Sequence, residues 1–191
     1  MKTLLRPAVS LFILLSLILG GLYPALVTGL GQTFFPQQAN GSLVERKGVV
    51  VGSSLIGQNF TGANYFWGRI SASGTFPYNG MASGGSNFGP LNPALADAAK
   101  ARAEELRAGQ AGGKGEIPLD LLTASGSGLD PHISPAGAEY QVERVAQARG
   151  MTVEQVRAIV LSQTEAPQWG LFGEPRVNVL GVNLALDGVA K

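Results

Sequence analysis

The chain has 191 residues and no cysteine, and only 14% of its residues are charged, against roughly 25% in soluble domains. Without cysteine there are no disulfides, zinc–thiolate sites or catalytic thiols. The formal net charge is +1, and setting Lys2 and Arg6 aside leaves a nearly neutral remainder. A near-neutral domain without a basic stripe argues against nucleic-acid binding.

The apolar stretch 8–30 predicts a transmembrane helix. No residue from Ala8 to Leu30 is charged, and a helix of that length spans roughly 34 Å, enough to cross a bilayer. The alternative is a cleaved signal peptide, but the apolar run exceeds the usual core and no A-x-A cleavage site follows. Pro24 lacks an N–H group, which predicts a kink or an early helix end near Tyr23.

Charge around this stretch predicts its orientation. Lys2 and Arg6 precede it, and the next charged residue is Glu45. By the positive-inside rule, the basic flank stays in the cytoplasm. We therefore expect a cytoplasmic N-terminus at 1–7, a transmembrane helix at 8–30 and an extracytoplasmic domain at 31–191, with the chain in the inner (plasma) membrane of a bacterial cell.

The domain is expected to be mixed α/β. Alternating or β-branched residues predict strands at 49–51, 64–70 ("NYFWGRI") and 176–186 ("RVNVLGVNLAL"). Good capping residues precede three predicted helices, which are 93–109 after Asn92, 136–149 after Ser134 and 153–164 after Thr152. The turn-rich segment 76–93 is expected to be a loop, either functional or pinned by partners, and 109–115 a flexible connector.

The stretch "TASGSGLDPHIS" (123–134) invites a functional interpretation. It contains the only histidine, His132, two residues after Asp130. A membrane-anchored envelope hydrolase using His132 is one hypothesis, although a triad is recognised by its geometry. The alternative is that both side chains satisfy backbone groups in the turn before Ser134.

Phosphate-binding motifs are incomplete in this chain. "AGQAGGKG" departs from the P-loop pattern at Ala108 and Gly115, and it follows a predicted helix instead of a strand. "GSGLDP" departs from G-x-G-x-x-G at Pro131. Gly126 and Gly128 instead suggest positive φ or close backbone approach.

Several segments together resemble a known family. They are "LRPAVSLF", "GSSLIGQNF" (52–60), "YFWGRISAS" (65–73), "YNGMASGGSN" (78–87), "LNPAL" (91–95), "TASGSGLDPHISPAGAEYQVERVAQARG" (123–150) and "VNVLGVNLALD" (177–187). The chain resembles the C subunit of the Kdp potassium-transporting P-type ATPase of bacteria and archaea, over essentially its whole length. The departures are Ile70, where the family usually has proline, and the variable connector at 109–115.

The resemblance implies a non-catalytic accessory subunit of an ATP-driven potassium uptake pump. Its implied partners are a channel-like potassium-binding subunit, the P-type ATPase subunit that hydrolyses ATP, a very small membrane subunit and membrane lipid. The family is also proposed to act as a catalytic chaperone that raises the ATP affinity of the ATPase subunit. The predicted external location argues against direct ATP contact. The resemblance implies a non-catalytic subunit, so we expect no catalytic residue in this chain, and we also expect no bound cofactor or metal.

The segments expected to make partner or internal close contacts share small, polar or aromatic residues. The candidate residues are Gln58, Asn59, Phe60, Ser83, Gly84, Gly85, Ser125, Gly126, Ser127, Gly128, Asp130 and His132.

Overall fold

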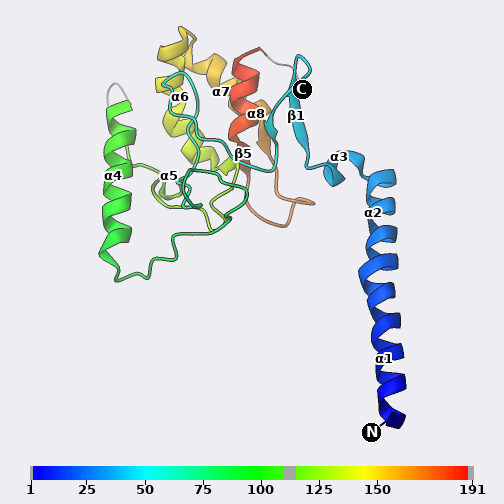
Figure 1. The fold of residues 1–191 in the computed structure, drawn as a ribbon. Coiled ribbons are helices and arrows are strands. Elements are labelled where there is room, and N and C mark those ends of the chain that lie inside the picture. Colours follow the sequence, from blue (N-terminus) through cyan, green and yellow to red (C-terminus); the bar gives the residue numbers. More distant parts are fainter. Residues whose placement is uncertain (1, 110–114, 189–191) are drawn as a thin grey trace. The chain divides into compact units, whose positions relative to one another are not determined.

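The computed structural model describes residues 2–109 and 115–188. The chain divides into two units, 1–43 and 44–191. Figure 1 traces both along the sequence. Most of the predicted connector at 109–115 falls outside the described residues.

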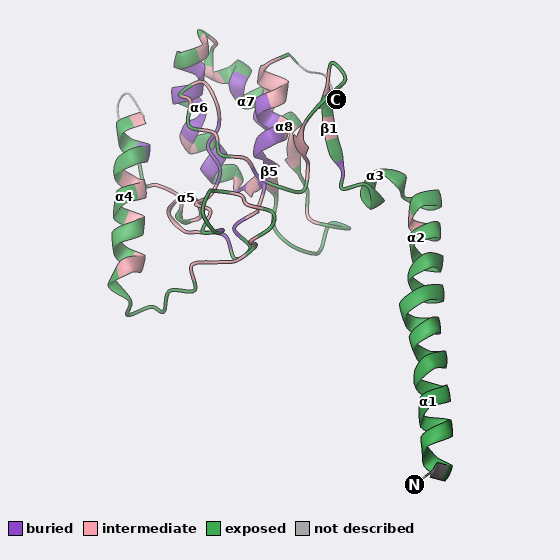
Figure 2. Cartoon of the chain, viewed as in Figure 1, coloured by how far each residue is buried: buried purple, intermediate pink, exposed green. Residues whose placement is uncertain are grey.

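The first unit is a long helix followed by a short one. It comprises α1 (Lys2–Leu17), a π-helical turn η1 (Ile18–Leu22), α2 (Tyr23–Phe34) and the one-turn helix α3 (Pro36–Ala39). Within the described residues, the helical run Thr3–Phe34 is the one long and apolar enough to cross a membrane. Its side chains are exposed along nearly the whole length (Figure 2), as a lipid-facing helix requires.

Pro24 does not end this helix, so of the two alternatives predicted near Tyr23, a kink or an early helix end, the early end is wrong. The helix continues to Phe34, and the irregularity is the π-helical turn Ile18–Leu22 just before the proline. Proline cannot donate to the carbonyl four residues earlier, and a π turn is a common way for a helix to absorb such a defect.

The second unit contains two small sheets. Strands β1 (Leu43–Arg46) and β2 (Val49–Ser53) form a two-stranded sheet, which confirms the strand predicted at 49–51. Strands β3 (His132–Ile133), β4 (Thr164–Glu165) and β5 (Arg176–Asn178) form an antiparallel sheet in the order β3-β5-β4. Val177 lies at its centre, opposite Ile133 on one side and Thr164 on the other.

The three predicted helices are present. They are α4 (Pro93–Gly109), α6 (Pro135–Arg149) and α7 (Val153–Ser162). Helix α7 ends two residues earlier than predicted. A further one-turn helix, α5 (Leu119–Leu122), precedes β3. The capping residues act as expected. Ser134 Oγ accepts a hydrogen bond from Gly137 N–H at 2.8 Å, and Thr152 and Gln155 form a reciprocal capping box.

The strand predicted at 176–186 is wrong beyond its first three residues. After Asn178 the chain forms helix α8 (Val179–Leu186), and Asn178 Oδ1 caps it by accepting from Gly181 N–H at 2.9 Å. The helix is apolar on most sides and several of its residues are buried. It therefore lacks the polar face that gives an amphipathic helix its recognisable period.

The strand predicted at 64–70 is also wrong, because side chains take the place of strand neighbours. Gln141 Oε1 accepts from Trp67 N–H at 2.8 Å, and Gln141 Nε2 donates to Trp67 O at 3.1 Å. Asn183 binds Phe66 N–H and O in the same way, at 2.8 and 3.0 Å. We call this arrangement the amide clamp: two side-chain amides on α6 and α8 that hold the backbone N–H and C=O groups of two consecutive residues, Phe66 and Trp67.

The core lies between these helices and the clamped segment. Figure 2 shows the buried residues concentrated on α6, α7 and α8. Fully buried members from distant parts of the chain are Phe66, Leu121, Val145, Val156, Val177 and Val182. The core therefore contains the clamped segment itself. The loops that follow begin at this buried segment, which fixes where they start.

Gln141→Leu should destabilise the domain strongly. The change leaves Trp67 N–H and C=O buried without their partner, at about 1–3 kcal/mol for each group. The matched control is Gln147→Leu, on the exposed side of the same helix, which should shift stability by no more than about 0.5 kcal/mol. Thermal unfolding of the full chain in detergent checks both, and equal stability of the two variants would contradict the role of the clamp.

Candidate functional site

Three of the predicted contact segments lie together. Gly57 N–H donates to Leu129 O at 2.9 Å, and Gly84 N–H donates to Ser127 O at 2.8 Å. The hydroxyl of Ser83 donates to the same Ser127 carbonyl at 3.0 Å. Residues 57–60, 83–85 and 125–132 thus form one cluster of loops, which we call the loop junction.

Close backbone approach at the junction requires glycine at position 128 and leaves little room for a side chain at position 85. Gly128 has φ +68°, and a Cβ there would lie 2.7 Å from Gly84 O. A Cβ at Gly85 would lie 3.0 Å from Gly126 O. The prediction of positive φ or close approach is confirmed for Gly128, whereas Gly126 has open space and no positive φ. Gly126 itself therefore does not need to be glycine for steric reasons.

Two serines pin the long loop 76–93 to the junction. Ser71 Oγ donates to Gly128 O at 2.6 Å and accepts from Tyr78 N–H at 2.8 Å. Ser73 Oγ accepts from Asn79 N–H at 2.9 Å. The Tyr78 hydroxyl donates to Arg69 O at 2.8 Å, and its burial raises its pKa to about 12. The loop is therefore held from within the domain over its first half.

Asp130 is the electrostatic centre of the junction. Its Oδ1 accepts from His132 N–H at 3.0 Å and lies 3.3 Å from His132 Nδ1, and its Oδ2 lies 3.2 Å from Arg69 Nη1. Burial alone would raise the pKa of Asp130, but the hydrogen bonds from His132 and the charge of Arg69 outweigh it and lower the pKa. Asp130 is therefore held as a carboxylate.

His132 does not have the surroundings of a catalytic base. Its Nδ1 faces Asp130, and its Nε2 lies 3.9 Å from Glu165 Oε2. A Ser-His-Asp triad needs one ring nitrogen directed at a serine hydroxyl, whereas here both face carboxylates. Within 2–109 and 115–188, no group of three or more His, Cys, Asp or Glu residues could hold a metal ion.

A cavity of about 360 Å³ adjoins the junction. Gln58, Asn59 and Phe60 line it, together with Arg69 and Arg102. The Gln58 amide donates to Val51 O at 2.6 Å, which ties this segment to β2. Arg69 and Arg102 are each paired with a carboxylate, those of Asp130 and Glu105. The polar groups of the cavity therefore mostly serve internal structure.

Nearly the whole chain matches one protein family. The family K+-transporting ATPase, c chain, matches residues 5–188. The chain belongs to the KdpC family. A "Potassium-transporting ATPase KdpC subunit" of Dechloromonas aromatica is 59% identical over 191 residues, covering 100% of both chains.

Other curated KdpC relatives cover the chain nearly as fully. One from Polynucleobacter asymbioticus is 58% identical over 188 residues, covering 98% of this chain and 100% of the relative. One from Variovorax paradoxus is 60% identical over 190 residues, covering 100% and 98%. The resemblance inferred from the sequence segments is confirmed.

Sequence reasoning missed several residues that build the junction of this KdpC-family domain. Arg69, Ser71, Ser73 and Tyr78 lie in the segments that carry the family resemblance. Arg69 and Ser71 bind residues 61 and 57 positions along the chain, whereas Ser73 and Tyr78 bind partners six and nine positions away. The serine spacing in "RISAS" was the available signal, since two hydroxyls two residues apart can bind adjacent backbone groups. Their targets, Gly128 O and the amides of the 76–93 loop, have no local sequence signature.

Gly128→Ala should loosen the junction. A side chain there meets Gly84 O and Ser73 and must adopt a left-handed conformation, which costs about 1–3 kcal/mol. Gly126→Ala in the same loop is the matched control and should change stability by about 0.5 kcal/mol or less. Hydrogen exchange of residues 78–85 in the full chain measures the effect. Equal protection in both variants would show that Gly128 does not position the loop.

Proposed function

We propose that this chain is the non-catalytic C subunit of an ATP-driven potassium uptake pump, needed for assembly and activity of its other subunits. The observation that carries the proposal is the KdpC family match over residues 5–188. Relatives that share 58–60% identity over nearly their whole length are named subunits of a potassium-transporting ATPase. Such identity over the full chain makes a shared place in the complex the simplest conclusion.

The proposed topology has one membrane crossing. Lys2 and Arg6 flank the apolar helix on its N-terminal side, and the first charge after it is Glu45. This asymmetry favours a cytoplasmic segment at 1–7, a transmembrane helix near 8–30 and an extracytoplasmic domain at 31–191. The membrane is the inner (plasma) membrane of a bacterial cell.

We propose that the domain acts by stabilising the assembled pump from outside. An external domain can affect ATP turnover only through coupled conformations. The Ser-Gly segments support this proposal, because Gly84 N–H and Gly128 N–H already donate to carbonyls of the junction. Amides used in this way are not available to cradle a phosphate, as a nucleotide loop requires. The catalytic-chaperone effect on ATP affinity would then be indirect.

Removing this subunit should abolish potassium-stimulated ATP hydrolysis by the pump. Membrane vesicles containing the other subunits, with and without this chain, allow the direct comparison. We expect hydrolysis to fall to the potassium-independent background without the chain and to return when the full chain is co-expressed.

The His132→Ala variant of the full chain separates this function from the hydrolase alternative. Restoration of pump activity by this variant, with no esterase activity in the purified wild-type chain, fits the proposal. Intrinsic ester hydrolysis lost in His132→Ala would support an envelope hydrolase instead. Unchanged pump activity in the absence of the chain would refute the accessory role.

Single cysteines test the topology, since the chain has none of its own. Met81→Cys places a thiol on a side chain that is 98% exposed in the second unit, and Thr3→Cys places one near the N-terminus. A membrane-impermeant maleimide should label Met81→Cys in intact spheroplasts and Thr3→Cys only after permeabilisation. The reverse pattern would place the domain in the cytoplasm and reopen direct ATP contact.

A further inference from the structure

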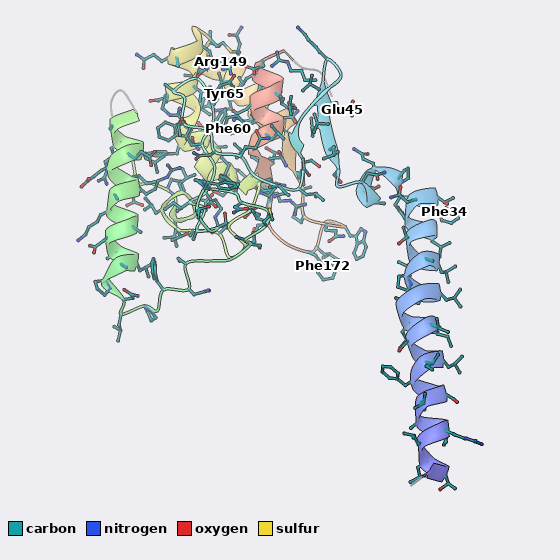
Figure 3. All side chains as sticks on the ribbon, viewed as in Figure 1. Phe34, Glu45, Phe60, Tyr65, Arg149 and Phe172 are labelled. Atoms are coloured by element: carbon teal, nitrogen blue, oxygen red, sulfur yellow. The ribbon has the colours of Figure 1, made fainter. Side chains whose placement is uncertain are left out.

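The turn between β4 and β5 exposes three large apolar side chains to solvent. We call residues 167–173, "PQWGLFG", the aromatic turn. Trp169 and Leu171 are each 82% exposed and Phe172 is 61% exposed. Figure 3 shows Phe172 on the loop that projects from the rest of the domain. Single exposed apolar residues are ordinary, but a contiguous group that includes tryptophan is typical of interaction sites.

The aromatic turn is held in one conformation by its backbone. Gln168 and Phe172 exchange two hydrogen bonds, at 2.8 and 3.0 Å, and Gly170 N–H donates to Pro167 O at 2.9 Å. Trp169 has φ +55°, a left-handed conformation that is unfavourable for a tryptophan. The turn therefore keeps its apolar side chains exposed at some conformational cost, and it needs little further ordering on binding.

The base of the turn is fixed to the folded domain. Glu165 and Arg176 are partners in the β4–β5 register and form an ion pair at 2.9 Å. The next residue, Val177, is fully buried in the centre of the sheet. Two short strands, β4 and β5, thus connect the turn directly to the core.

The charge around the turn favours a protein over a lipid surface. No residue from 167 to 173 is charged, and the nearest charges are Glu165, Glu174 and Arg176, two acidic and one basic. Segments that bind anionic bilayers carry an excess of Lys and Arg beside their apolar residues. Tryptophan is instead one of the residues enriched among the energetic anchors of protein–protein interfaces.

We infer that the aromatic turn is a docking anchor that inserts Trp169, Leu171 and Phe172 into an apolar pocket of another subunit of the same pump. The pocket has a neutral or basic rim, since acidic Glu174 flanks the anchor, whereas Glu165 is already paired with Arg176. This inference rests on the proposed function, because it needs the chain to be part of the assembled complex.

Photocrosslinking in the co-expressed complex identifies what the turn contacts. The photoreactive amino acid p-benzoyl-phenylalanine is introduced at Trp169 and, as control, at Leu161, an exposed leucine on α7. We expect irradiation to join position 169 to another pump subunit, identified by mass spectrometry, and position 161 to none. Attachment to lipid alone, or no protein crosslink at 169 while the subunits still co-purify, would overturn the inference.

Substitutions in the full chain measure the strength of the contact. Trp169→Ser should reduce the pump subunits retained on the tagged chain about tenfold or more, as expected for an anchor residue. Leu171→Ser should also reduce retention, whereas the matched variant Leu161→Ser should stay within about twofold of wild type. Thermal unfolding near that of wild type excludes loss of folding as the cause.

The outcomes separate the two claims. If the wild-type chain retains no pump subunit, the proposed function fails. If the wild type retains them and Trp169→Ser retains as much, only the docking inference fails.

Discussion

The amide clamp is the interaction on which the domain depends. Phe66 and Trp67 are buried, yet their peptide groups have no strand beside them. Buried N–H and C=O groups must find partners, and Gln141 and Asn183 provide all four. Because the two amides belong to α6 and α8, one irregular segment joins both helices. The clamp therefore fixes the position from which the chain continues, through Gly68, to the loop junction.

Arginine side chains extend the clamp toward its N-terminal side. Arg144 is buried and donates to Ala63 O and Tyr65 O at 2.7 and 3.0 Å, and its guanidinium lies over the Trp67 ring at 4.2 Å. Burial, with nearby Arg102 adding to the effect, lowers the pKa of Arg144 to about 10. Arg149 lies over the ring of Tyr65 (Figure 3). Because the Arg144 guanidinium binds these carbonyls and also the face of the Trp67 indole, it stabilises the observed backbone conformation of residues 63–67.

Local signals predicted α4, α6 and α7 well, but they missed helix α8 and the clamped segment. Asn92, Ser134 and Thr152 mark helix starts because capping acts within three residues of the cap. "NYFWGRI" reads as a strand because its composition suits a half-buried extended chain, but the partners that satisfy it are side chains more than seventy residues away. The convergence of residues 57–60, 83–85 and 125–132 likewise depends on distant backbone contacts that leave no mark in any one segment. The family resemblance singled out these segments without indicating that they touch.

The sequence separation within the amide clamp has a consequence for how the domain forms. Phe66 is bound by a residue 117 positions later, and Trp67 by one 74 positions later. Contacts this remote give a domain a high contact order and slow folding. Asn183 lies in the last described helix, α8, so the core cannot close until the chain has been synthesised beyond this residue. Until then the aromatic 65–67 segment stays exposed, and apolar surface exposed in this way during folding is prone to aggregation.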